Sequence, residues 1–291
     1  MRMQIKWRGG VLFGFIFSLL LSGCSGGGSS TPEAVTAPPA GPVAWNEVEG
    51  LHGIWIGTSS NGRAIWGAVV DDKFYLWYSA IGDPTMLRGG ITGSFDFDSG
   101  EIRNGVLRAI NTFDFTMDDR TVYIAELIGK YVPKQTLTGT MYLRQGGSVS
   151  FSLTYVSDSG TKVGDPGPIG VANFADIIGT YDGQSIYIGT GRPMVTIAPD
   201  GALHIQGYLD GFSGHNWETT QCPTTDGHIN TQYWGATVYQ LRLTIGCLFP
   251  ARDVTGAALF DPTTRQLFLF AWRGNPGEPL QAFIHTITKR P

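Results

Sequence analysis

The sequence has few basic residues and no cluster of them. Its 291 residues include 20 Lys+Arg and 24 Asp+Glu, and the formal net charge is −4 at pH 7. Three of the basic residues, Arg2, Lys6 and Arg8, lie in the first 23 positions, where there is no acidic residue, so the remainder is more acidic still. Nucleic-acid binding needs clustered Lys and Arg to neutralise phosphates. The charge pattern therefore argues against a nucleic-acid partner.

The sequence also lacks the spacings on which catalytic and metal sites are usually built. Its five histidines are scattered, and no two lie four residues apart as on a zinc-binding helix. The one Gly-x-Ser-x-Gly match, Gly23–Gly27, has no predicted strand before it or helix after it, as a nucleophile elbow requires. Asp96–Glu101 offers oxygen ligands but lacks the other positions of a calcium loop, so an ordinary polar turn is expected there. The sequence predicts a protein that is not an enzyme and uses no cofactor or metal.

Long apolar runs are absent apart from one at the N-terminus. Val11–Leu21 is about 11 residues long, whereas a membrane-spanning helix needs about 20. Basic residues precede this run, and Leu-Ser-Gly-Cys (Leu21–Cys24) ends it, which is typical of a secretory signal peptide. The tetrapeptide resembles the lipobox of bacterial lipoproteins. The alternative is an ordinary signal peptide with an incidental cysteine.

The lipobox resemblance implies a location for the mature chain. Residues 1–23 would be removed, and Cys24 would carry lipid, including palmitate, as the new N-terminus. Residues 24–46 are rich in Ser, Gly and Pro and are expected to form a flexible tether. By the same resemblance, Ser25 after the cysteine favours a lipid-anchored position in the outer membrane, on its periplasmic or cell-surface face.

Cysteine is rare, which limits the possible disulfides. With Cys24 committed to lipid, Cys222 and Cys247 remain as an even pair in an oxidising compartment. A bridge between them would close a loop of about 26 residues, with a stabilisation of about 3–4 kcal/mol. It is expected to hold a Thr- and Gly-rich excursion at 223–235. Two buried free thiols are the alternative.

Helical periodicity longer than about two turns is missing, and short β-type segments take its place. In Ser148–Tyr155, apolar residues alternate with Ser and Thr, which places one row in a core and the other in water. Similar segments are Phe74–Tyr78, Thr121–Ile128, Met194–Ile197, Val238–Ile245, Gln266–Trp272 and Ala282–Ile287. Turns are expected between such segments, among them Asp71-Asp72, Asp98-Ser99-Gly100, Asp200-Gly201 and Asp226-Gly227. Short helical turns are expected near Trp45–Val48 and Ala172–Asp176.

The folded part reads as two similar halves. A Gly- and Pro-rich stretch predicts a linker at 158–171 between domains at 47–157 and 172–291. Gly53–Gly57 opens the first half and Gly179–Gly183 opens the second, both with an aromatic third residue. A second pair of matching segments, Leu137–Leu143 and Val254–Phe260, follows in the same order. The sequence therefore predicts a tandem repeat.

The Gly-x-aromatic-x-Gly opening resembles that of lipocalins and avidins, which are small up-and-down barrels. A glycine lets a strand bend at a barrel corner, and the aromatic ring closes one end. We therefore expect an all-β chain with two tandem antiparallel barrel-like domains behind a lipidated tether. This architecture resembles bacterial surface lipoproteins such as the factor H-binding protein and transferrin-binding protein B-like families. No binding residue of those families is carried over by the resemblance.

These features favour a non-catalytic binding or interaction module of the cell envelope, with a structural envelope component as the alternative. Its expected partners are the membrane, through the lipid, and a protein or a small molecule. A hollow barrel would favour a small ligand, and a filled one would favour a protein. In Gly211–Trp217, aromatics lie among Gly, Ser and Asn without alternation. Phe212, His215 and Trp217 are therefore candidate partner contacts, the alternative being a packed loop.

Overall fold

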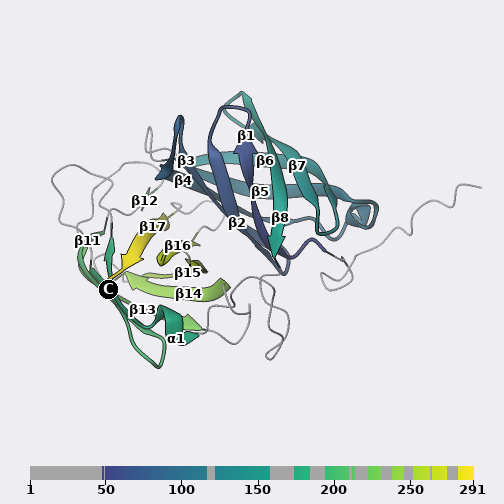
Figure 1. Cartoon of the computed structure of the whole chain (residues 1–291). Coiled ribbons are helices and arrows are strands. Elements are labelled where there is room, and N and C mark those ends of the chain that lie inside the picture. Colours follow the sequence, from purple (N-terminus) through teal and green to yellow (C-terminus); the bar gives the residue numbers. More distant parts are fainter. Residues whose placement is uncertain are drawn as a thin grey trace, which may run out of the picture. The chain divides into compact units, whose positions relative to one another are not determined.

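Two closed β-barrels, each a ring of eight antiparallel strands, follow one another along the chain (Figure 1). The computed structural model describes residues 48, 50–116, 122–157, 174–183, 194–209, 212–213, 222–230, 238–245, 252–262, 264–273 and 281–291. The sequence prediction of an all-β chain with two tandem barrels is confirmed. The predicted linker at 158–171 lies outside the described residues.

The first barrel is an uninterrupted up-and-down meander, purple to teal in Figure 1. Its strands are β1 (Gly53–Ser59), β2 (Ala64–Val70), β3 (Lys73–Ala80), β4 (Asp83–Phe95), β5 (Val106–Thr116), β6 (Val122–Val132), β7 (Thr136–Leu143) and β8 (Ser148–Ser157). A short 3-10 helix, η2 (Glu101–Asn104), lies between β4 and β5. The ring closes where β1 pairs with β8, with Gly57 opposite Leu153.

The second barrel follows the short helix α1 (Phe174–Ile177). Its ring consists of β9 (Gly179–Gly183), β10 (Met194–Ile197), β11 (Ala202–Leu209), β13 (Cys222–Asn230), β14 (Val238–Ile245), β15 (Arg252–Asp261), β16 (Gln266–Arg273) and β17 (Gln281–Lys289). The ring closes where Ile287 of β17 pairs with Gly183 of β9. The two-residue strand β12 (Phe212–Ser213) pairs with the other end of β17.

Most predicted strands are found within a few residues of their expected positions, but one predicted turn was wrong. Asp226-Gly227 lies inside β13, paired with β11 and β14. Gly227 is needed there because a Cβ would lie 2.5 Å from the carbonyl oxygen of Arg242 on the next strand. The excursion expected at 223–235 is therefore strand as far as Asn230.

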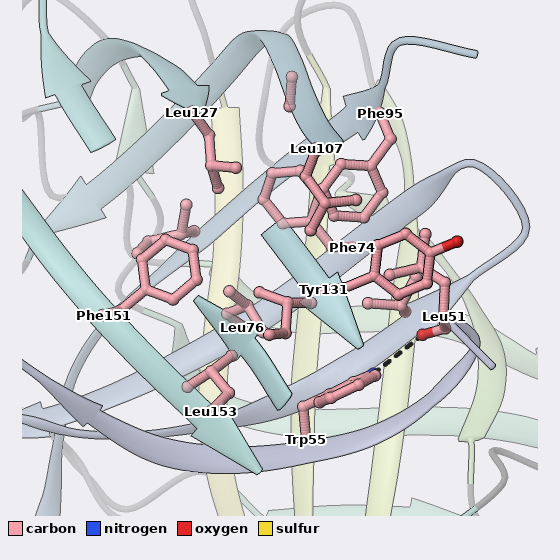
Figure 2. Packing of buried hydrophobic residues seen from close by; sticks show 14 of the residues in the cluster. Leu51, Trp55, Phe74, Leu76, Phe95, Leu107, Leu127, Tyr131, Phe151 and Leu153 are labelled. Carbon is pink, nitrogen blue, oxygen red and sulfur yellow. Dashed lines mark hydrogen bonds between the residues drawn. The ribbon is translucent and has the colours of Figure 1, made fainter. Parts of the chain in front are cut away.

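Alternation of side chains fills the interior of the first barrel. Inward residues from strands all around the ring pack into one apolar cluster, which Figure 2 shows from close by. Phe74 and Leu76 of β3 meet Phe151 and Leu153 of β8 there, and all four are buried. Burial of such side chains stabilises the fold by about 1.5–3 kcal/mol each. The interior is therefore a packed core.

The two barrels open with the same local arrangement. Trp55 of β1 donates its indole N–H to the carbonyl of Leu51 at 3.0 Å, drawn as a dashed line in Figure 2. Tyr181 of β9 donates its hydroxyl to the carbonyl of Ile177 at 2.7 Å, also four residues upstream. Each strand starts with a glycine at positive φ, 144° at Gly53 and 139° at Gly179. The first pair of matching segments therefore occupies equivalent strands.

The second pair of matching segments does not. Leu137–Leu143 lies on β7, the seventh strand of the first ring, whereas Val254–Phe260 lies on β15, the sixth strand of the second ring. The interval between the two landmarks is similar in both halves because the strand and turn lengths differ. Sequence spacing alone could not reveal a shift of one strand.

A third apolar cluster joins outward-facing residues of both barrels. Its members are Ile54, Ala68, Val70, Tyr75, Trp77, Leu87 and Phe115 of the first barrel and Val238, Ala257, Leu259, Phe270 and Ile284 of the second. The Phe270 ring lies 5.9 Å from that of Trp77 and 5.8 Å from that of Phe115, both edge-on. The Trp77 indole N–H also donates to the carbonyl of Leu269 at 3.4 Å. β3 and β16 are therefore buried on both faces.

This contact predicts a strong effect of removing the Phe270 ring. We expect Phe270→Ala to lower the free energy of unfolding by about 3–5 kcal/mol, the usual cost of emptying a buried aromatic site. Denaturant unfolding followed by circular dichroism measures this. Tyr142→Ala, which removes an exposed ring, is the control and should change stability by less than about 0.5 kcal/mol. A Phe270→Ala value equal to this control would contradict the assignment.

Buried tyrosines predict a loss of stability at alkaline pH. Burial raises the pKa of Tyr75, Tyr181 and Tyr239 above the ordinary value. Above pH 10 the unfolded chain loses these protons while the folded chain keeps them, so the free energy of unfolding falls as pH rises. The slope is at most about 1.4 kcal/mol per pH unit for each tyrosine. Urea unfolding between pH 9 and 11 measures it, and Tyr75→Phe should reduce the slope; equal slopes in the two proteins would contradict the prediction.

Candidate functional site

The inward residues of both barrels are occupied by core packing. In the second barrel, Ile205, Leu241 and Leu269 belong to one buried cluster with inward residues of the other strands. A ligand in either lumen would have to displace such side chains. The outer faces of the barrels are therefore the better place to look for a contact surface.

A polar cluster on strands β2, β3 and β5 is satisfied within the fold. The buried Tyr78 donates its hydroxyl to Asp114 at 2.8 Å, and the Arg63 guanidinium lies 4.9 Å from the Tyr78 ring centroid. Burial, followed by the charge of Asp114, raises the pKa of Tyr78 well above its usual value, which keeps the hydroxyl protonated as a donor. Arg63 also donates to the carbonyl of Ser79 at 2.8 Å. These contacts explain the cluster as a link between strands.

The outer face of the second barrel carries exposed ion pairs. His204 Nδ1 lies 2.6 Å from Asp226 Oδ1, and Arg242 donates to Asp253 at 2.6 Å. Thr244 donates to the other oxygen of Asp253 at 2.8 Å. Exposed pairs of this kind contribute about 0–1 kcal/mol. Among the residues that the structure describes, no group of three or more His, Cys, Asp and Glu could hold a metal ion.

The outer face of the first barrel differs on β7, β8 and β1, where the outward positions carry no charge. These ten positions are Thr136, Thr138, Thr140, Tyr142, Ser148, Ser150, Ser152, Thr154, Ile56 and Thr58. Eight of them are serine or threonine. We call them, together with Ile128 and Val132 of the neighbouring strand β6, the uncharged face. It lies on strands other than β3, β4 and β5, which carry much of the contact with the second barrel.

Strand register arranges the hydroxyl groups in rows. Thr138 is opposite Ser152, which is opposite Thr58, and a second row joins Thr140 to Ser150. The hydroxyl oxygens of Thr140 and Ser150 are 3.0 Å apart, within hydrogen-bond distance. Neighbouring strands are about 4.8 Å apart, and residues two apart on one strand are separated by about 6.8 Å. The face is thus a regular array of small groups that donate and accept.

Large apolar side chains gather on the same face. Six large hydrophobic residues are exposed among those that the structure describes, and four of them lie here. They are Ile56 (48% exposed), Ile128 (37%), Val132 (45%) and Tyr142 (49%). Ile56 and Val132 lie on either side of the paired residues Thr154 and Thr136 in one cross-strand row. Contiguous exposed apolar groups on a soluble surface are typical of interaction sites.

The site residues predicted from the sequence are not brought together by the described structure. Cys24, Cys247, His215 and Trp217 lie outside the described residues. Phe212 belongs to β12, where its backbone pairs with Ala282, so a two-residue strand interrupts the predicted loop. Cys222 is the first residue of β13, opposite Leu209. Lipidation, the disulfide and the partner loop stay predictions.

The uncharged face was not singled out from the sequence, although part of its signal was present. The alternation in Ser148–Tyr155 predicted an outward row of hydroxyl residues, and Thr136-Leu-Thr-Gly-Thr140 has the same period. The absence of Lys, Arg, Asp and Glu from both rows was the missed observation, since outward strand positions commonly carry charge.

The comparisons with known proteins add no relative: no protein-family model matches the chain, and no curated protein matches it. Across the described part of the chain, no helix is long and apolar enough to cross a membrane. The argument for function therefore rests on the lipobox resemblance and on the surface of the first barrel.

Proposed function

We propose that this chain is a membrane-anchored bacterial lipoprotein whose barrels act as a non-catalytic interaction module in the cell envelope. The observation that carries the proposal is the uncharged face, with Ile56, Ile128, Val132 and Tyr142 exposed on it. The packed interiors favour recognition at the surface over capture of a small ligand in a lumen.

The composition of the uncharged face suits an interface. Charged residues are depleted at the centre of protein interfaces because their desolvation is costly, and tyrosine is enriched. A buried aliphatic side chain contributes about 1.5–3 kcal/mol, and each Ser or Thr hydroxyl can both donate and accept a hydrogen bond. A partner could therefore cover this face without removing water from an unpaired charge.

Lipid attachment at Cys24 would place the module at a membrane. The proposal rests on the apolar run at Val11–Leu21 and the lipobox-like Leu21–Cys24. Residues 24–46, rich in Ser, Gly and Pro, would connect the lipid to the barrels. The anchor would confine the chain to a surface, where even weak contacts are favoured by the raised local concentration.

The lipid anchor is tested by substituting its attachment site. Labelled palmitate should enter the wild-type chain, which we expect in the outer-membrane fraction, and should be absent from Cys24→Ala, which should be released in soluble form. The matched control is Ser25→Ala, which keeps the thiol and should keep the label. Label retained by Cys24→Ala would contradict the proposal.

The interaction role is tested by placing a charge on the uncharged face. Ile128→Asp combined with Tyr142→Asp should reduce capture of an envelope partner by the full chain at least about tenfold, since a covered, unpaired carboxylate is costly. Cross-linking in intact cells followed by quantification of the adduct measures capture. Ile81→Asp, at a 63% exposed position between β3 and β4, is the control and should leave capture unchanged. Equal adduct yields from both variants would exclude the uncharged face.

A further inference from the structure

We infer that the uncharged face binds a second copy of this chain, through a two-fold contact centred on Ile128 of β6. This inference rests on the proposed function, because it takes the uncharged face to be a contact surface and names what covers it. Three properties of the face, its charge, its hydroxyl groups and the order of residues along β6, favour a copy of itself.

The first property is the absence of charge in a chain that is acidic overall. With a net charge of −4, two copies repel one another at long range. A two-fold contact also brings the same patch together from both copies, so any charge near the axis faces its own kind. The outward positions of β7, β8 and β1 carry none. This surface can therefore meet its copy without like charges in contact.

The second property is that the polar groups of the face suit themselves. A hydroxyl is both a donor and an acceptor, whereas a carboxylate only accepts and an ammonium group only donates. The pair Thr140 and Ser150, 3.0 Å apart, already shows two such groups in contact within one copy. Rows of Ser and Thr can make the same contact across a two-fold axis, and a row of Asp or Lys could not.

The third property is the order of outward residues on β6. Glu126, Ile128 and Lys130 follow one another on that face, each two residues apart. A two-fold axis lying across the strands at Ile128 would place Ile128 against its own copy. It would also place Glu126 against Lys130 of the second copy, twice. Glu126 lies 3.6 Å from Arg108 within its own copy and stays half-exposed, so it can meet a second cation.

The size of the face predicts a weak contact. Four strands at about 4.8 Å spacing and about eight residues of length cover on the order of 500 Å² per copy. This is below the roughly 800 Å² per partner of a stable complex. Dimers are therefore expected mainly where a membrane concentrates the chain.

The experiment is cysteine cross-linking of the full chain in its own membrane. Ile128→Cys, treated with a short bis-maleimide, should give a covalent dimer. Ile81→Cys is the control: it is more exposed than Ile128, lies off the face, and retains the same native cysteines. We expect at least about fivefold more dimer from Ile128→Cys. Equal yields would mean random collision and would overturn the inference.

A charge exchange tests the pairing itself. In the Ile128→Cys background, Lys130→Glu should lower the dimer yield, since it sets Glu126 against a glutamate, and adding Glu126→Lys should restore it. Far-UV circular dichroism checks that each variant folds. Failure of the exchange to restore the dimer would overturn the pairing.

The remaining outcomes separate this inference from the proposed function. An adduct of Ile128→Cys with a mass other than the dimer would overturn the second copy while supporting a contact role for the face. The absence of any adduct from Ile128→Cys would overturn both.

Discussion

The contact around Phe270 sets the conditions for the rest of the molecule. The ring packs against Trp77 and Phe115 of the other barrel, and a Cβ on Gly90 would lie only 2.7 Å from it. Strands at this contact are buried on both faces, so their outward residues are apolar as well. The barrels are thus two separate rings, each with its own core, joined by a third core. The outer surface left for other contacts is divided by this junction.

Period-two alternation made the barrels predictable, because a strand with one wet face repeats every two residues. The junction was not predicted, although its signal was visible. Phe74–Tyr78 and Leu267–Trp272 are apolar on both faces, as in strands that are covered twice. The turn assigned to Asp226-Gly227 failed for a different reason. Its glycine serves close strand packing, which local sequence cannot distinguish from a turn.

The uncharged face could be predicted only in part. Alternation places Thr138 and Ser152 outward, yet their grouping with Ile56 depends on closure of the ring, since β1 and β8 are about 100 residues apart in the sequence. Charge is a local property and closure is not. The sequence could therefore indicate which side chains face water, but not which of them become neighbours.

Closure of the first ring has a consequence for how the protein can fail. Every strand of that barrel pairs on both sides, because β1 and β8 satisfy each other's backbone groups. An open sheet would expose a row of unpaired N–H and C=O groups, the usual template for strand addition and amyloid growth. The Ser- and Thr-rich strands β7 and β8, which have high β-propensity and low charge, would be hazardous at such an edge. Their position inside a closed ring allows an envelope protein to keep an uncharged surface at high local concentration without polymerising through its backbone.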